Sequence, residues 1–262
     1  MPHIKHDGIE TFYAERGEGP PIVLIHGAEA DHSMFDRLVP HLCKHWRCIA
    51  YDQRDSGRTR NGTDEYPVER LADDVAGLIA TLALPRAHIF GTSLGSVIAQ
   101  NLAVRHPHRV DRLVLSSAIR AGQVMADFAP ETANRLAKLR ADPVVNADAI
   151  ASHFFPEPHL REHPGLFASL RSGRSPEQAA RRAGLLRRRY DLDLSAIANP
   201  TLVLVGAADR LIPPAHSLSI ADEIAGSERH VLDGIGHVGS VQAPEATAQI
   251  ITEFLNGGGK RR

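Results

Sequence analysis

A serine between two glycines most constrains what this chain can fold into: residues 91–95 are Gly-Thr-Ser-Leu-Gly. An apolar run at residues 87–90 precedes this segment, and a helix-patterned stretch from Leu94 to about His106 follows it. A serine at such a tight strand-to-helix corner needs small residues two positions away on either side, because a Cβ there would collide with adjacent backbone. The pattern therefore predicts a sharp turn that presents the Ser93 hydroxyl.

The pentapeptide alone leaves a second interpretation open, in which Ser93 only caps the following helix. A serine hydroxyl is a poor nucleophile unless a base takes its proton and an acid orients that base. Residues of both kinds follow predicted strands: Asp209 comes after the apolar run 201–206, and His237 after the short run 230–232. Because sites collect at the carboxyl ends of parallel strands, we expect Ser93, Asp209 and His237 to meet there.

The order Ser93, Asp209, His237 resembles that of the α/β-hydrolase superfamily, and the resemblance covers nearly the whole chain. It is also carried by two other segments, His26-Gly27 after the run 22–25 and residues 52–59 after the run 48–51. The resemblance implies an α/β-hydrolase fold, with a mostly parallel central sheet and helices on both faces. It further implies a Ser-His-Asp triad of nucleophile, base and orienting acid.

Two backbone amides are candidates for an oxyanion hole, which holds the negative oxygen formed when a serine attacks a carbonyl. The helix after Ser93 aims its first N–H groups, that of Leu94 among them, at an oxyanion formed near the Ser93 hydroxyl. By resemblance, the Ala28 amide is the second donor, and His26 holds its loop by hydrogen bonding.

The strand pattern stops after residue 115 and resumes only at Thr201, a gap of more than 80 residues. This is too long for a simple connection in a compact domain, and its content is helical and amphipathic. We expect residues 119–195 to form a helical cap inserted after the sixth strand, with residues 1–118 and 196–262 as the core. Such a cap walls the pocket and sets substrate choice.

Substrate contacts are expected mainly from the cap and from the residues beside the triad. The cap offers aromatic side chains, although many of these pack against one another in a small helical layer. Glu29 either lines the pocket mouth or is solvated. The predicted substrate-binding residues are Glu29, Phe128, Phe154, Tyr190 and Val238.

Five arginines form a basic run in the predicted cap. This run either recruits an anionic substrate or lies on a solvated helix face, and we favour the second interpretation. The five residues are Arg181, Arg182, Arg187, Arg188 and Arg189.

Composition restricts the function classes. A chain of 262 residues with 43% hydrophobic content can bury one large core, and a net charge of −1 argues against nucleic-acid binding. No signal-like segment or run of 18 apolar residues is present, so we expect no membrane association and a cytoplasmic location. Cys43 and Cys48 are expected to be free thiols. A basic charge supplied almost entirely by arginine hints at a bacterial gene.

Histidine is abundant, with 15 residues, and two pairs have the i, i+4 spacing of metal ligands: His41 with His45, and His159 with His163. Neither pair has a glutamate after its first histidine, so we expect no metal and no cofactor.

Among the families that the chain resembles, the cap-bearing esterase and lactonase branch is the nearest, including 3-oxoadipate enol-lactonases and polyketide methylesterases. Ser96 departs from the glycine that is common there. The resemblance implies hydrolysis of a small carboxylic ester or lactone through an acyl-enzyme, by a monomer or homodimer. Carbon-carbon bond hydrolysis of meta-cleavage products and amide hydrolysis are alternatives, and a ligand receptor with slow turnover is another. Dehalogenase and epoxide hydrolase chemistry is disfavoured, because those relatives carry aspartate at position 93.

Overall fold

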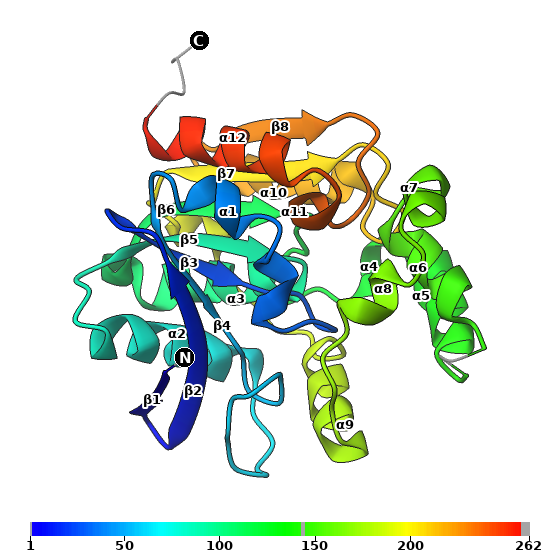
Figure 1. Cartoon of the computed structure of the whole chain (residues 1–262), viewed down its shortest axis with the longest axis horizontal. Coiled ribbons are helices and arrows are strands. Elements are labelled where there is room, and N and C mark those ends of the chain that lie inside the picture. Colours follow the sequence, from blue (N-terminus) through cyan, green and yellow to red (C-terminus); the bar gives the residue numbers. More distant parts are fainter. Residues whose placement is uncertain (1, 143–144, 258–262) are drawn as a thin grey trace.

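One central sheet organises the protein. The computed structural model describes residues 2–142 and 145–257, and in these residues eight strands form a sheet in the order β1-β2-β4-β3-β5-β6-β7-β8 (Figure 1). Strands β3 to β8 are mutually parallel, whereas β1 and β2 form an antiparallel hairpin at one edge. The predicted mostly parallel sheet is thereby confirmed. The strands are β1 His3–His6, β2 Ile9–Arg16, β3 Pro21–Ile25, β4 Arg47–Tyr51, β5 Ala87–Thr92, β6 Val110–Ser116, β7 Thr201–Gly206 and β8 Glu228–Leu232.

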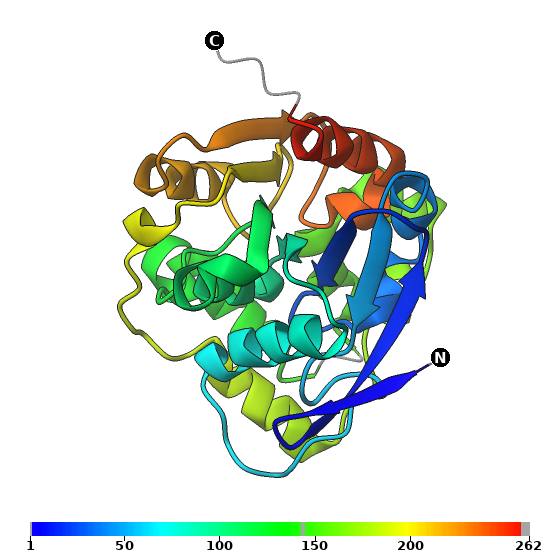
Figure 2. The same ribbon diagram turned by 90° about the vertical axis from the view of Figure 1, so that its left-hand side faces the viewer.

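The central strands are continuous apolar runs because helices cover both of their faces. Every residue of β5 and of β7 is buried, which is typical of parallel strands between two helical layers. Figure 2 shows α1 and α12 on one face of the sheet and α2 and α3 on the other. The helices of this core are α1 Val39–Leu42, α2 Val68–Thr81, α3 Leu94–Arg105, α10 Pro214–Glu223, α11 Gly239–Gln242 and α12 Pro244–Leu255, with 3-10 turns η1 His32–Phe35, η2 Pro107–Arg109 and η3 Leu194–Ala196.

A second group of helices lies between β6 and β7 in the sequence. In Figure 1 these helices are gathered beyond the carboxyl ends of the parallel strands, with α9 set apart from the others. They are short, and α5, α7 and α9 each begin at or next to a proline, whose fixed φ suits a first helical turn. The helices are α4 Met125–Phe128, α5 Pro130–Leu139, α6 Ala147–Phe154, α7 Glu157–Glu162, α8 Leu166–Ser169 and α9 Pro176–Leu185.

Across the described part of the chain, no helix combines the length and the apolar character that crossing a bilayer requires.

Candidate active site

Ser93 sits at the corner between β5 and α3 with φ of 54°, a backbone region that non-glycine residues rarely adopt. A Cβ on Gly91 would lie 2.3 Å from the Gly95 carbonyl oxygen, and one on Gly95 would lie 2.1 Å from the Ile25 carbonyl oxygen. Both positions therefore require glycine. The Ser93 side chain makes no helix-capping hydrogen bond, so the geometry differs from that of a simple capping serine.

Ser96 reinforces this corner. Its hydroxyl donates to the Ser93 carbonyl oxygen at 2.6 Å and accepts from the Ile119 N–H at 3.2 Å. The Ser93 N–H donates to the Ser116 carbonyl oxygen at the end of β6. The residue that departs from the resembled families thus ties the corner to the start of the segment between β6 and β7.

Asp209 and His237 form a buried, directed pair beyond the ends of β7 and β8. His237 Nδ1 lies 2.9 Å from Asp209 Oδ2, and the other carboxylate oxygen accepts the backbone N–H groups of Leu211 and Ile212, each at 2.9 Å. An ionised carboxylate accepts from Nδ1–H, which leaves Nε2 with a free lone pair. Nε2 is buried and has no hydrogen-bond partner in residues 2–142 and 145–257. The imidazole is therefore held in the tautomer of a general base.

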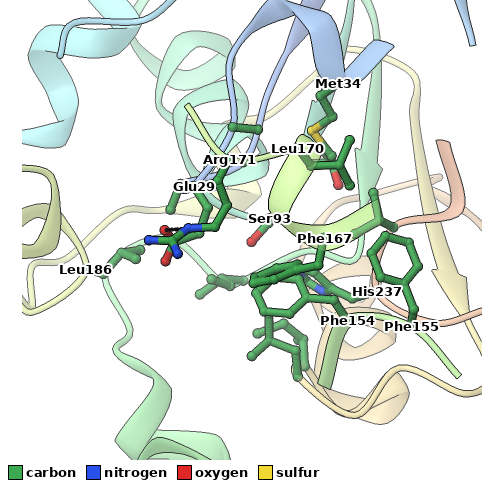
Figure 3. A pocket seen from close by; sticks show the side chains of 18 of the residues that line it. Glu29, Met34, Ser93, Phe154, Phe155, Phe167, Leu170, Arg171, Leu186 and His237 are labelled. Carbon is green, nitrogen blue, oxygen red and sulfur yellow. Dashed lines mark ion pairs between the residues drawn. The ribbon is translucent and has the colours of Figure 1, made fainter. Parts of the chain in front are cut away.

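Ser93 and His237 face one cavity of about 80 Å³ whose lining is mostly apolar (Figure 3). It lies between the strand ends and the helices that follow β6, with Ile119 and Leu211 among its lining residues. A hydroxyl and a free imidazole nitrogen thus face the same mostly apolar space.

The loop that carries His237 is fixed by the end of α6. The His237 N–H donates to the Phe154 carbonyl oxygen at 2.8 Å, and the two rings meet edge-on with centroids 5.5 Å apart. A Cβ on Gly236 would lie 2.6 Å from the same carbonyl oxygen. Contact between α6 and the β8 loop therefore helps to orient the imidazole.

His26 fixes the peptide group that contains the Ala28 amide. Its Nε2 accepts from the Gln53 N–H at 3.2 Å, so its Nδ1 carries the proton and donates to the Gly27 carbonyl oxygen at 2.8 Å. Burial, together with the nearby positive charge of Arg182, lowers the pKa of His26 well below its usual value and keeps the ring neutral. Since Gly27 C=O and Ala28 N–H belong to one planar peptide group, this bond also sets the direction of the Ala28 N–H.

Arg182 of α9 is almost fully buried, and its side chain contacts the loop after β3 that contains Ala28. It donates to the Ala28 carbonyl oxygen at 3.2 Å, to the Arg54 carbonyl oxygen at 2.9 Å and to the Gln53 side-chain oxygen at 2.9 Å. Burial lowers the pKa of this guanidinium. One side chain thus joins α9 to the loops after β3 and β4.

For Arg181 and Arg182, this placement corrects the expectation that the basic run lies on a solvated helix face, whereas Arg187, Arg188 and Arg189 follow α9 and are exposed. Arg182 is buried, and Arg181 makes a two-pronged ion pair with Asp55, with nitrogen–oxygen distances of 2.7 and 2.8 Å. Burial alone would raise the pKa of Asp55, but hydrogen bonds from Arg181, Tyr66 and Asn61 outweigh it and hold that pKa below its usual value. A helical pattern does not distinguish a solvated face from one that other loops cover.

Three of the predicted substrate-binding residues, Glu29, Phe154 and Val238, line the cavity, whereas Phe128 and Tyr190 do not. The Phe128 ring stacks on the His216 ring with centroids 3.7 Å apart. The Tyr190 hydroxyl accepts a hydrogen bond from the Asn101 side chain at 2.8 Å. Both aromatic groups therefore pack elsewhere.

Sequence reasoning missed two charged residues of the cavity, Arg140 and Arg171. They follow α5 and α8, and no local pattern marks them. A helix-by-helix prediction could not have found them, because their place depends on how the short helices stack.

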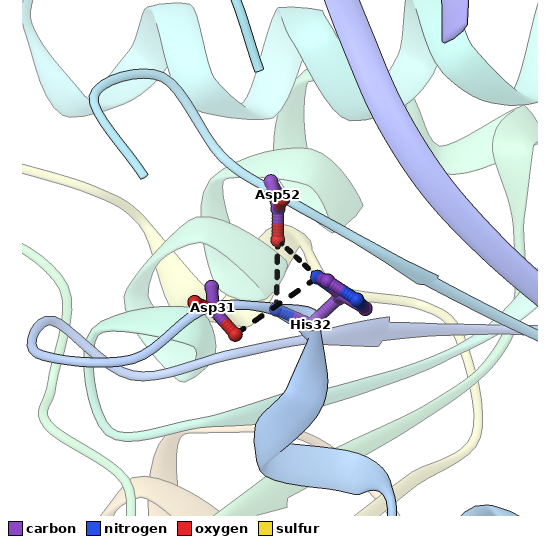
Figure 4. Close-up of side chains that lie close together, drawn as sticks. All are labelled: Asp31, His32 and Asp52. Carbon is purple, nitrogen blue, oxygen red and sulfur yellow. Dashed lines mark hydrogen bonds and ion pairs between the residues drawn. The ribbon is translucent and has the colours of Figure 1, made fainter. Parts of the chain in front are cut away.

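Asp31, His32 and Asp52 bring three potential metal-ligand atoms within 4.8 Å of one another (Figure 4). All three side chains are engaged within the protein. His32 Nδ1 lies 2.7 Å from Asp52 Oδ1, while Asp31 accepts from the Ser33 N–H and hydroxyl. The hydrogen bond to Asp52 raises the pKa of His32. These hydrogen bonds tie η1 to the loop after β4.

Comparison with known proteins agrees with this architecture. Residues 20–244 match a family model described as alpha/beta hydrolase fold. A 2-hydroxymuconate semialdehyde hydrolase of Pseudomonas putida is 31% identical, with 95% of this chain and 91% of that relative covered. Similar solved structures include an enol-lactonase from Burkholderia xenovorans (28% identity, TM-score 0.84, 97% and 100% covered) and an esterase from Thermogutta terrifontis (28%, 0.82, 95% and 94%). The chain belongs to the α/β-hydrolase fold family.

Proposed function

We propose that this hydrolase cleaves a carboxylic ester or lactone through an acyl-enzyme formed on Ser93. The observation that carries the proposal is the buried His237, whose Nδ1 is bonded to Asp209 and whose Nε2 is unpaired among the described residues, beside a cavity that Ser93 also lines. This arrangement suits a general base that takes a proton from a serine hydroxyl.

The reaction would proceed in two halves. Ser93 Oγ attacks the substrate carbonyl carbon while its proton passes to His237 Nε2, and Asp209 stabilises the resulting imidazolium. The tetrahedral intermediate collapses as His237 protonates the leaving alkoxide, which gives an alcohol and an acyl-serine. Water, activated by His237, then releases the carboxylic acid and restores Ser93.

The developing oxyanion would be held by the amides of Ala28 and Leu94. Ala28 lines the cavity beside Ser93, and His26 fixes the peptide group that contains its N–H. Leu94 is the first residue of α3, where N–H groups lack partners within the helix. Both donors are backbone groups set before substrate binds, which is the arrangement that stabilises an oxyanion most effectively.

We further propose that residues 119–195 act as a cap over this site, because α6 and α8 supply apolar cavity walls through Phe154 and Phe167. The free thiols of Cys43 and Cys48 suit a reducing compartment, so we propose that the enzyme acts on small molecules in the cytoplasm.

The test is hydrolysis of p-nitrophenyl acetate, butyrate and octanoate by the purified protein and by Ser93→Ala. We expect saturable hydrolysis that is lost in the variant, with acetate or butyrate preferred because the cavity is small. Equal rates in both proteins would contradict the proposal. Ser217→Ala is the matched control, since that buried serine donates to the Ala118 carbonyl oxygen away from the cavity lining.

Carbon-carbon bond hydrolysis is a second candidate, favoured by the similarity to the 2-hydroxymuconate semialdehyde hydrolase. The same serine, base and oxyanion donors would act on a ketone carbonyl, with a carbon leaving group. Assaying a vinylogous diketone beside the ester panel separates the two: turnover of the diketone with negligible ester hydrolysis would favour this second function.

A further inference from the structure

The otherwise apolar cavity has a charged group at one side, made of Glu29, Arg140 and Arg171. Arg140 donates to Glu29 Oε1 at 3.0 Å, and Arg171 Nε lies 3.9 Å from Glu29 Oε2. Figure 3 shows Glu29 and Arg171 on one side of Ser93, and Phe154, Phe155 and Phe167 toward the other. The charged group therefore lies in the same cavity as the candidate nucleophile.

This group carries a net positive charge, and it has more hydrogen-bond donors than the Glu29 carboxylate can accept. Two guanidinium groups face one carboxylate, and each guanidinium carries five N–H donors in a planar fork. Within the part of the chain that the structure describes, the Arg140 side chain makes a single hydrogen bond, and Arg171 makes only its long ion pair with Glu29. The remaining donors match the two oxygens of a carboxylate.

A substrate carboxylate can also replace Glu29 as the partner of Arg140 and Arg171 at little cost. The side chains of Arg140, Arg171 and Glu29 are 42%, 44% and 33% exposed, and ion pairs in such positions add little stability. The Glu29 backbone is held separately, because its carbonyl oxygen accepts from the Ser172 N–H at 2.8 Å and from Arg174 at 3.1 Å. The Glu29 side chain can therefore move without the loop moving.

We propose that Arg140 and Arg171 bind a carboxylate on the substrate, at the end remote from the bond that Ser93 attacks. When no substrate is bound, the Glu29 carboxylate pairs with the same arginines and therefore competes with the substrate for them. The inference rests on the proposed function. The substrate class that it specifies is monoesters of dicarboxylic acids. A phosphate monoester is less suited, because its doubly charged group loses more solvation beside the apolar walls.

The test compares two substrates of equal chain length, mono-p-nitrophenyl adipate, which is anionic, and p-nitrophenyl hexanoate, which is neutral. The measured quantity is the ratio of kcat/KM for the anionic ester to that for the neutral one, corrected for spontaneous hydrolysis. We expect a wild-type ratio above one that falls as salt is added, since salt screens exposed charges. Binding of monomethyl adipate and methyl hexanoate to Ser93→Ala, measured by calorimetry, gives the same comparison without turnover.

Charge variants make the test specific. We expect Arg140→Gln and Arg171→Gln each to lower the ratio about tenfold, and Glu29→Gln to raise it about threefold, as charge-assisted hydrogen bonds are lost or freed. Arg161→Gln is the matched control, because Arg161 is exposed on α7, pairs with Glu157 and does not line the cavity. It changes the net charge equally, and the ratio should stay the same.

The outcomes separate this inference from the proposed function. A wild-type ratio of one or less, or a ratio that Arg140→Gln, Arg171→Gln and Arg161→Gln leave equal, would overturn the inference even if ester hydrolysis depends on Ser93. If neither ester is hydrolysed, the proposed function fails. The binding comparison on Ser93→Ala then decides whether the arginines select the anion.

Discussion

The two walls of the cavity hold their functional groups in different ways. On the wall at the strand ends, backbone groups fix the candidate triad: Ser93 is set by a corner that needs two glycines, and Asp209 by two backbone N–H donors. On the wall formed by α4 to α8, side chains from short helices, such as Phe167 and Arg140, face the cavity. The difference teaches that side chains of the helical wall can be exchanged without moving Ser93, Asp209 or His237 on the other wall.

The largest expected effect is a loss of kcat when a residue of the strand-end wall is replaced. Asp209→Asn keeps an acceptor oxygen for the N–H groups of Leu211 and Ile212 but removes the charge that holds the His237 tautomer, so we expect kcat to fall about 10⁴-fold. Steady-state kinetics on an ester checks this. Asp193→Asn, which alters an exposed capping carboxylate at η3, is the control and should leave kcat unchanged. A loss of less than tenfold in Asp209→Asn would show that the pair is not catalytic.

Glycine substitutions compare the corner at Ser93 with the helix α9 through the free energy of unfolding. Gly95→Ala forces a Cβ against the Ile25 carbonyl oxygen, and we expect it to lower the free energy of unfolding by about 2 kcal/mol or more. Gly184→Ala in α9 meets nothing within 4 Å and should raise it by about 0.5 kcal/mol, because alanine restricts the unfolded chain. Urea denaturation measures both. Equal effects would mean that the corner is not rigid.

Arg182 joins α9 to the loops after β3 and β4 on the strand-end wall, and its replacement should lower kcat more than it weakens substrate binding. Lysine cannot reach the carbonyl oxygens of Ala28 and Arg54 together with Gln53, so Arg182→Lys should lower kcat about tenfold, a part of the loss that follows removal of an oxyanion donor. Affinity for a trifluoromethyl ketone, which forms a tetrahedral adduct, should fall in parallel while KM stays within about threefold. Arg188→Lys, an exposed change on the same segment, is the control. An unchanged affinity for the ketone would limit Arg182 to a structural role.

The smallest expected effect is a change in how the free energy of unfolding depends on pH. His26 stays neutral in the folded protein because burial lowers its pKa, whereas in the unfolded chain it titrates near 6.5. Below that pH the unfolded chain binds a proton that the folded protein does not, so stability falls. Asparagine can donate to Gly27 and accept from Gln53 without titrating, so the wild type should lose about 1 kcal/mol more than His26→Asn between pH 7 and 5.5. Parallel urea midpoints across this range would contradict the neutral ring.

The positions of Ser93, Asp209 and His237 next to strand ends could be predicted from the sequence because the patterns that mark them are local. A glycine two residues on either side of Ser93, and a strand before Asp209 and before His237, are visible without knowing what packs against them. The strands were predicted from apolar runs in the same way, and their mostly parallel arrangement from the resemblance to the α/β-hydrolase superfamily.

The contacts made by residues 119–195 were predicted less well, because they join segments that are distant in the sequence. Arg182 has the sequence pattern of a helix surface, and only the loops after β3 and β4 bury it. Phe128 and Phe167 are the same residue type in similar short helices, yet one stacks on His216 and the other lines the cavity. Arg140 and Arg171 acquire their partner only when both approach Glu29.

The central claim is that the strand-end wall forms one reactive serine, and covalent labelling tests it most directly. The protein would be incubated with a fluorophosphonate, then digested, and its peptides examined by mass spectrometry. We expect one adduct per chain, on Ser93. It should form much more slowly in His237→Gln and at an unchanged rate in His230→Gln, which alters an exposed histidine on β8. An unlabelled protein, or an adduct on another residue, would contradict the central claim.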